Sequence, residues 1–311
     1  MRVLVSGSLA YDRIMDFQGK FQDHILPDKI HIINVSFFIP QLRQSYGGTA
    51  GNIAYTLSLL KEEPVLLCTH GNDFSEYEAW CKKNNIITQF SKQMKDLPTA
   101  SVYIITDRSD NQISAFYPGA MIHSNGPISK GLLRRAGFAI VSPGNVEDMN
   151  KYAKLYKKEK TKYIYDPGQQ ITNLSKKDLI FGINGSDVFI SNDYELSMVL
   201  KKTRLTEKKI LNMSKVLITT LGDKGSIIKT KTRNYKIPVA KPKKVLDPTG
   251  AGDAYRAGLI RALVNNFDLP KAGRLAALTS VYAVENYGTQ SHSFKLADLK
   301  KRFKQNFKEN L

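Results

Sequence analysis

Short runs of apolar residues alternate along the chain with segments in which apolar positions recur at helical spacing. Apolar runs that predict buried strands occupy residues 3–5, 65–68, 138–141, 163–165, 188–190 and 216–219. Helical spacing occupies residues 49–60, 75–83, 146–157, 251–265 and 271–286. Strands that alternate with helices are typical of βαβ units. We therefore expect a single doubly wound α/β domain over residues 1–311, with a mostly parallel sheet flanked by helices.

Two segments interrupt this alternation. Residues from about 13 to 44 and from about 99 to 120 show the period of strands, as in Ser101 to Ile105 and Gln112 to Phe116, without helical patterns between them. We expect these insertions to form a small lid of β-strands on the same domain.

The composition excludes several classes of protein. With 311 residues, 42% of them hydrophobic, the chain can bury a sizeable core, so disorder is not expected. No run approaches the roughly 20 apolar residues that cross a bilayer, and Ser6 follows Met1 too soon for a signal-peptide core. Cys68 and Cys81 form no CxxC pair, and the five histidines lack metal-ligand spacing. We expect a cytoplasmic protein with free thiols, no structural zinc and no membrane contact.

The formal net charge of +18 raises nucleic acid as a partner, because clustered lysines and arginines displace counterions from phosphates. Here the basic residues are dispersed. The lysine-rich stretches at residues 151–162, 201–209 and 295–308 look like solvated helix faces. We therefore expect no specific nucleic-acid partner, and we expect the charge to attract an anionic nucleotide.

A turn of small residues between Asp247 and Gly258 leads directly into an amphipathic helix. Such a junction directs unpaired backbone N–H groups and the positive end of the helix dipole toward an anion. The stretch predicts a phosphate site, although the chain contains no GxxxxGK sequence followed by Ser or Thr. Asp253 lies in the first helical turn, where an aspartate commonly interacts with the helix dipole. Beside an anion site, it could also accept the proton of a substrate hydroxyl.

This stretch resembles the C-terminal signature of the ribokinase-like (PfkB-type) carbohydrate kinases, and residues 47–54 resemble their N-terminal signature. The resemblance covers nearly the whole chain. It implies an ATP-dependent kinase that transfers the γ-phosphoryl group of ATP to a sugar hydroxyl. In the family pattern Asp253 is the general base, and the backbone of Gly250, Ala251 and Gly252 forms the anion hole.

The resemblance also implies a site for the phosphoryl acceptor. Gly48, Asn52 and Asp12 match the family residues that hold sugar hydroxyls, and Gly47 lies in the same loop. A carboxylate and an amide can hold vicinal hydroxyls through paired hydrogen bonds, and the glycine pair permits close approach of the backbone. Taken alone, the glycines and Asp12 would equally fit an ordinary turn.

Asn192 and Glu195 look like the NxxE motif of the family. The resemblance implies that they position Mg²⁺ largely through the water molecules that the ion retains. The same spacing is also that of a helix capping box.

A second set of residues is implied for the nucleotide. Thr220, Gly222 and Gly225 resemble the loop that holds the nucleotide phosphates, for which a plain β-turn is the alternative, and Asn286 matches the region that lines the ATP base. The expected cofactors are ATP and Mg²⁺. A requirement for a monovalent cation stays open.

Several short phrases look most like the adenosine and nucleoside kinase branch of the family. They lie at residues 110–113, 115–120, 166–169 and 287–290. They place Gln112 and Phe116 near the substrate, where Phe116 could stack on a purine, although aromatic residues at strand spacing are also ordinary lid packing. We therefore expect phosphoryl transfer to the 5′-hydroxyl of adenosine or a related nucleoside.

Two alternatives remain from the sequence. One is a sugar kinase of the ribokinase or fructokinase type, and the other is a non-catalytic nucleoside or sugar sensor, against which Asp253 and Glu195 argue. The expected partners are ATP and a nucleoside or sugar. The oligomeric state stays open between a monomer and a homodimer that pairs through the lid, and the sequence assigns no role to Arg256.

Overall fold

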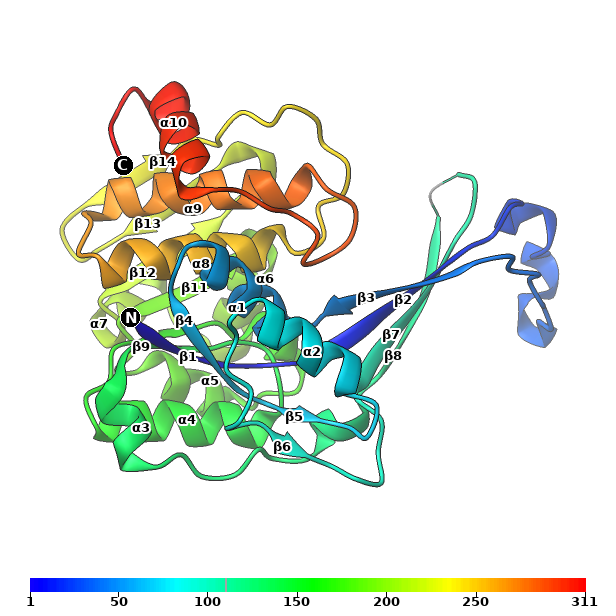
Figure 1. Cartoon of the computed structure of the whole chain (residues 1–311), viewed down its shortest axis with the longest axis horizontal. Helices are drawn as coiled ribbons and strands as arrows, with labels where there is room; N and C mark the ends of the chain where they lie inside the picture. The colour runs from blue at the N-terminus through cyan, green and yellow to red at the C-terminus, as the bar shows by residue number, and fades with distance from the viewer. Residues whose placement is uncertain (110) are drawn as a thin grey trace.

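The computed structural model describes residues 1–109 and 111–311, so Asp110 of the phrase at 110–113 lies outside the described residues. Figure 1 shows a large body from which a narrow arm of strands projects to one side. Within the described part of the chain, no helix combines the length and the apolar character needed to cross a membrane.

The body is built on an eight-stranded sheet, counted over residues 1–109 and 111–311. In spatial order the strands are β14 (Asn234–Ile237), β13 (Ser226–Lys229), β12 (Val216–Thr220), β11 (Val188–Asn192), β10 (Tyr163–Tyr165), β9 (Ala136–Val141), β1 (Arg2–Ser6) and β4 (Glu63–Leu67). Neighbours from β4 to β12 are parallel, and β13 and β14 add an antiparallel hairpin. The predicted mostly parallel α/β sheet is confirmed.

Helices cover both faces of this sheet. One face carries α1 (Thr49–Leu59), α2 (Ser75–Lys83), α8 (Ala251–Val264), α9 (Leu269–Val284) and α10 (Leu296–Phe307). The other carries α3 (Lys130–Arg135), α4 (Val146–Lys158), α5 (Lys176–Ile183), α6 (Asp193–Thr203) and α7 (Glu207–Met213). Side chains alternate between the two cores along each strand, as Val3 and Val5 join one core and Leu4 the other. This packing makes the sheet doubly wound.

The order of the strands reverses at β1, which pairs with β4 on one side and with β9 on the other. In open α/β sheets, the crevice at the carboxyl ends of the strands near such a reversal is the usual place for a ligand. The residues that follow β1 therefore stand where a binding site is expected.

The arm begins as a second sheet of the described residues, with the order β3 (Leu42–Gly47), β2 (Ala10–Asp16), β7 (Ala100–Thr106) and β8 (Gln112–Tyr117). Strands were expected across residues 13–44, but they form only at the two ends of that segment, in β2 and β3. Between them lie two short 3₁₀ helices, Phe21–Asp23 and Pro27–Ile32, the second starting at a proline that has no N–H to donate. That this sheet acts as a lid stays a prediction.

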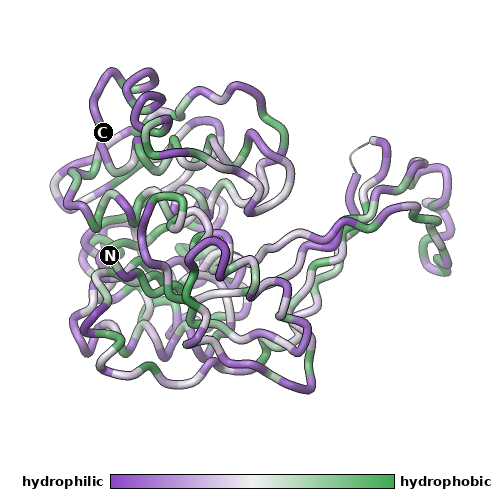
Figure 2. The backbone as a smooth tube through the Cα atoms, viewed as in Figure 1, coloured by the Kyte–Doolittle hydropathy of each residue, from purple (hydrophilic) through white to green (hydrophobic). Residues whose placement is uncertain are grey.

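Some elements were not predicted from the sequence. They include the hairpin β13–β14 and a small sheet of β5 (Thr69–His70) and β6 (Lys92–Gln93), whereas the lysine-rich stretch at residues 295–308, expected to be a solvated helix face, forms α10. Figure 2 shows hydrophobic chain gathered in the centre of the body and again near the tip of the arm. Cys68 and Cys81 are buried free thiols, as expected.

Candidate active site

A cleft of about 930 Å³ lies between the carboxyl ends of the main-sheet strands and the second sheet. Ser8 after β1, Asn192 at the end of β11 and Thr220 at the end of β12 line it from the body. Val102 and Phe116 line it from the second sheet. Since these two residues pair across β7 and β8, one face of the second sheet looks onto the cleft.

The turn before α8 forms one wall of this cleft. Gly250 has a φ of 77° and is the N-cap of α8, a left-handed conformation that glycine adopts without strain. The Asp247 carboxylate accepts N–H bonds from Thr249 and Gly288, each at 2.9 Å, which fixes the start of the turn. Burial opposes ionisation of Asp247, but these bonds hold its pKa below the ordinary value.

The three residues predicted for the anion hole are placed differently from one another. Gly250 and Gly252 line the cleft, whereas Ala251 lines a neighbouring cavity. The N–H of Ala251 donates to the carbonyl oxygen of Pro248 at 3.1 Å. The cleft wall is therefore formed by the two glycines on either side of Ala251.

Asp253 lines the cleft next to this turn, and Nδ2 of Asn52 donates to its Oδ2 at 2.8 Å. Burial raises the pKa of Asp253 to about 7, although Arg256 and the bond from Asn52 act in the opposite direction. A carboxylate with a pKa near neutral pH is suited to act as a general base, because it is a stronger base than an ordinary carboxylate and a large fraction of it is still ionised at the working pH.

The amide of Asn52 is oriented by its own neighbours. Nε2 of Gln290 donates to Oδ1 of Asn52 at 3.2 Å, and the indole N–H of Trp80 donates to Oε1 of Gln290 at 2.9 Å. This chain directs the N–H₂ group of Asn52 toward Asp253. Gln290 was not predicted as a site residue, and the only signal for it was the phrase at 287–290.

Asp12 and Gly48 also line the cleft. Burial raises the pKa of Asp12. The hydroxyl of Thr289 donates to the Asp12 carboxylate at 3.0 Å and partly offsets this increase. Gly48 has a φ of 84°, and a Cβ there would lie 2.5 Å from the carbonyl oxygen of Ser8. Gly47 lies behind the wall, where its carbonyl accepts from the hydroxyl of Tyr77 at 2.8 Å.

Asn192 and Glu195 form a complete capping box at the start of α6, and both side chains also line the cleft. Oδ1 of Asn192 accepts from the N–H of Glu195 at 2.7 Å, and Oε2 of Glu195 accepts from the N–H of Asn192 at 2.8 Å. Burial, and next the charge of Asp166, raise the pKa of Glu195. The structural interpretation of this motif is confirmed, and its position leaves the second role available.

The oxygen-bearing side chains at the cleft bear on whether it can hold a magnesium ion. In the described ranges, no group of three or more His, Cys, Asp or Glu side chains is arranged to hold a metal directly. Asn192 and Glu195 offer oxygen ligands, the type that Mg²⁺ prefers. They fit an ion that keeps most of its water molecules rather than one enclosed by protein.

A second cavity, of about 370 Å³, adjoins the cleft and shares Thr220 and Gly252 with it. Gly222, Gly225 and Ala251 also line this cavity, together with the apolar side chains of Val239, Val245, Val281 and Val284. The N–H of Leu221 donates to the carbonyl of Gly225 at 2.8 Å, so this loop is also a closed turn. An apolar slot beside a phosphate site suits a nucleobase.

Two predicted site residues lie away from these cavities. Gln112 lines another cavity, of about 580 Å³, together with Asp12 and Asp247. The amide of Asn286 donates to the carbonyl of Tyr282 at 2.8 Å, at the end of α9. The structure does not bring either side chain to Asp253, because Gln112 lies at the far end of β8 and Asn286 turns back onto its own helix.

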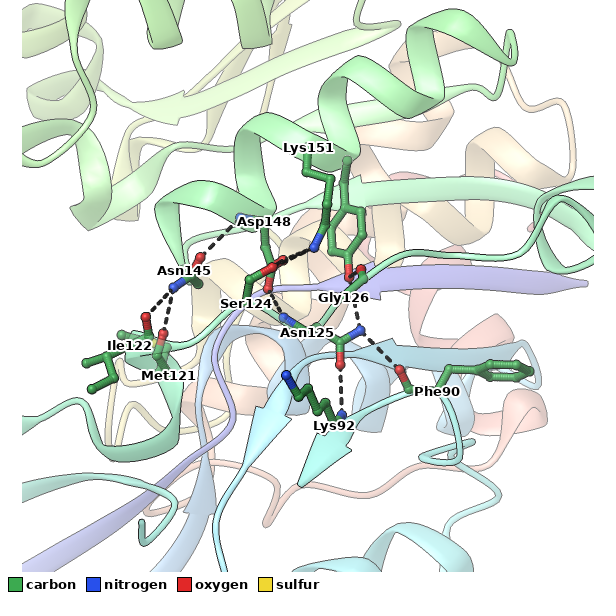
Figure 3. A network of polar contacts seen from close by, with 11 residues as sticks. Phe90, Lys92, Met121, Ile122, Ser124, Asn125, Gly126, Asn145, Asp148 and Lys151 are labelled. Atoms are coloured by element: carbon green, nitrogen blue, oxygen red, sulfur yellow. Dashed lines mark hydrogen bonds and ion pairs between the residues drawn. The ribbon is translucent and has the colours of Figure 1, made fainter. Parts of the chain in front are cut away.

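The chain that leaves β8 is fastened to the body by the polar network in Figure 3. The Asp148 carboxylate accepts from the hydroxyl of Ser124 at 2.6 Å and from the N–H of Asn125 at 2.8 Å. The amide of Asn145 donates to the carbonyls of Met121 and Ile122 at 3.0 and 2.9 Å. Since Met121 lines the cleft, this network fixes one end of its wall.

The chain is similar to known proteins over nearly its whole length. The model of a family described as pfkB family carbohydrate kinase matches residues 13–295. Over 262 residues the chain is 34% identical to a nucleoside kinase of Methanocaldococcus jannaschii, covering 83% of this chain and 85% of that protein. A structure of Burkholderia thailandensis nucleoside kinase in complex with inosine is similar with a TM-score of 0.88, 33% identity and 99% coverage of each chain. The same kinase in complex with ADP-inosine gives a TM-score of 0.86 at 35% identity, covering 99% of this chain and 97% of that chain.

Proposed function

Because the chain belongs to the pfkB family of carbohydrate kinases, it is a phosphotransferase that acts on an alcohol, and we propose that it phosphorylates the 5′-hydroxyl of adenosine or a related nucleoside from ATP. The observation that carries this proposal is the meeting of Asp253, Asn52 and Asp12 with the turn at Gly250 and Gly252 in one cleft. Acceptor-binding groups, a base and an anion site are the parts that phosphoryl transfer needs.

In the proposed reaction, Asp12 and Asn52 hold the ribose hydroxyls and leave the 5′-hydroxyl beside Asp253. The Asp253 carboxylate takes the hydroxyl proton as the oxygen attacks the γ-phosphorus, and ADP leaves. Backbone N–H groups at Gly250 and Gly252 and the positive end of α8 stabilise the negative charge of the transferring group. This assignment uses the two glycines that line the cleft rather than Ala251.

The apolar cavity beside the cleft would take the adenine ring of ATP, with Thr220, Gly222 and Gly225 next to its phosphates. Asn192 and Glu195 would hold Mg²⁺ through water. When bound, the ion supplies positive charge that neutralises the phosphate oxygens.

A nucleoside is favoured over a free sugar by the second sheet. Phe116 is 53% exposed and, with Val102 and Met121, gives the cleft an apolar wall, which a free sugar with its ring of hydroxyls would not need. Aromatic and apolar side chains stack on base rings. The relatives described above are named nucleoside kinases, and one of them was solved with inosine.

A substrate panel tests this function. The purified protein would receive Mg-ATP with adenosine, inosine, other nucleosides, ribose, fructose or fructose 6-phosphate, and ADP release would be measured. We expect turnover with nucleosides. Turnover with free sugars alone would replace the nucleoside assignment by a ribokinase or fructokinase activity, and calorimetric binding without any turnover would indicate a sensor.

The lid and the oligomeric state stay predictions. Closure of the second sheet over a bound nucleoside would exclude water from the γ-phosphoryl group. Tyr103, Ile113 and Tyr117 are exposed, and their register places them on the face that points away from the cleft. A homodimer through the lid would use this face, and sedimentation of the purified protein distinguishes it from a monomer.

A further inference from the structure

Arg256 lies one helical turn after Asp253, and its side chain is 9% exposed at the edge of the cleft. Its Nε and Nη2 donate to the two carboxylate oxygens of Asp166, the latter at 3.1 Å. Its Nη1 donates to the carbonyl oxygen of Gly252 at 2.9 Å. One planar guanidinium therefore joins a carboxylate after β10 to the backbone of the phosphate turn.

The two ends of this connection belong to different parts of the site. Asp166 comes directly after β10 and is followed by the 3₁₀ helix Gly168–Thr172, whose Gly168 and Gln169 line the cleft. Gly252 lies in the turn proposed to hold the transferring phosphoryl group. Arg256 thus couples the segment after β10, which lines the cleft, to the proposed anion site.

Stability alone is a weak reason for this ion pair. Removing two charges from water costs about as much as their attraction returns, so a buried pair can often be replaced by apolar side chains without loss of stability. Arg256 is also packed tightly, since a Cβ on Gly252 would lie 2.9 Å from its Nη1. Instead, the three N–H groups of Arg256 that donate hydrogen bonds fix the geometry of the turn at Gly252.

The charges around Asp253 also indicate a functional role for Arg256. Burial above all raises the pKa of Asp253, Arg256 and the amide of Asn52 lower it, and the charges of Asp166 and Asp12 raise it further. The three carboxylates come from β2, from the end of β10 and from α8. Without the guanidinium, their mutual repulsion would leave less of Asp253 ionised at neutral pH.

We propose that Arg256 is a positioning residue which, oriented by Asp166, holds the carbonyl of Gly252 and so fixes the direction of the backbone amides and of Asp253 at the phosphate turn. This inference rests on the proposed function. Arginine is needed rather than lysine, because an ammonium group cannot donate in a planar fork to a carboxylate and a carbonyl at once.

The variants Arg256→Lys, Arg256→Met and Asp166→Asn test this role, with ADP release measured from Mg-ATP and adenosine. We expect each to lower kcat roughly 10- to 100-fold, because a displacement of about 1 Å at the reacting groups has an effect of that size. The KM for ATP should change much less, since the turn acts mainly on the transition state. In Arg256→Met, the acidic limb of the pH profile should also move to higher pH.

Arg261→Met is the matched control. Arg261 is on the same helix and pairs with the buried carboxylate of Glu62, away from the cleft. The Arg261→Met variant should be less stable than the wild type and keep the wild-type kcat. If the Arg256 variants keep the kcat of the wild type, or if Arg256→Lys alone keeps it fully, the inference is wrong. Absence of nucleoside turnover in the wild type would instead refute the proposed function. Should Arg256→Met fail to fold, Asp166→Asn and Arg256→Lys still decide the question.

Discussion

Asn52 donates an amide N–H to the carboxylate of Asp253 at 2.8 Å, although 201 positions separate the two residues in the chain. The bond joins the first turn of α1 to the first turn of α8, two helices that pack against each other on one face of the sheet (Figure 1). The turn at Gly48 and the turn at Gly250, which lead into these two helices, are therefore held together.

Replacement of Asp253 by Asn should remove the base and keep the shape of the side chain. We expect kcat for nucleoside phosphorylation to fall by about 10²- to 10⁴-fold, the usual contribution of a general base. Steady-state ADP release measures the loss, and circular dichroism checks that the variant folds. A rate near that of the wild type would refute the role of Asp253.

The pH dependence of the reaction follows from the same carboxyl group. Because burial raises the pKa of Asp253 to about 7, most of it is protonated at pH 6 and ionised at pH 8. We expect kcat/KM to rise through this window as the base form appears. A profile that is flat between pH 6 and pH 8 in the free enzyme would show that Asp253 does not limit the rate in this way.

Stability should depend on Asp253 in the opposite direction to most carboxylates. The ordinary pKa of 3.8 is raised in the folded chain to about 7, so between these values the unfolded chain has lost a proton that the folded chain keeps. The contribution of this group to stability is therefore greatest below pH 3.8 and is lost as pH rises toward 7. Relative to wild type, Asp253→Asn should gain melting temperature from pH 5 to pH 8. Equal differences at both pH values would contradict the linkage.

Asn52→Leu should separate orientation from simple packing, since leucine keeps the bulk but donates no hydrogen bond. A hydrogen bond to a charged group contributes about 1.5–3 kcal/mol, so we expect kcat to fall roughly 10- to 100-fold. In the wild type the bond from Asn52 lowers the pKa of Asp253, so its removal should raise this pKa and move the acidic limb of the pH profile to higher pH. An unchanged profile with only a higher nucleoside KM would limit Asn52 to substrate binding.

Gly48→Ala should destabilise the fold more than a comparable change elsewhere. At Gly48 the new Cβ meets backbone atoms of Ser8 and Ala10 at 2.5 and 2.7 Å, in addition to the strain of a φ of 84°. Gly126, with a φ of 99° and nothing within 4 Å of a new Cβ, isolates the strain alone. We expect Gly126→Ala to cost about 1–2 kcal/mol and Gly48→Ala clearly more, measured by urea unfolding. Equal losses would show that the loop relaxes around the methyl group.

Much of the architecture was predictable from the pattern of residues. Apolar runs and helical spacing identify the strands from β1 to β12 that form the parallel part of the main sheet, because burial on both faces is recorded directly in local sequence. The glycines at 48 and 250 were also identifiable, since their positive φ angles are local requirements. The hairpin β13–β14 was missed, and the strand pattern over residues 13–44 concealed two 3₁₀ helices.

The sequence by itself thus determined the strands of the parallel sheet, many of the helices that cover it and the glycine turns that lead into α1 and α8. Only the tertiary structure decided that Asn52 faces Asp253, that Arg256 joins Asp166 to Gly252, and that Gln112 and Asn286 stand apart from the cleft. Strand and turn preferences depend on neighbours a few residues away, whereas these contacts depend on the order in which distant strands pair within a sheet. That order is set by the packing of the whole chain.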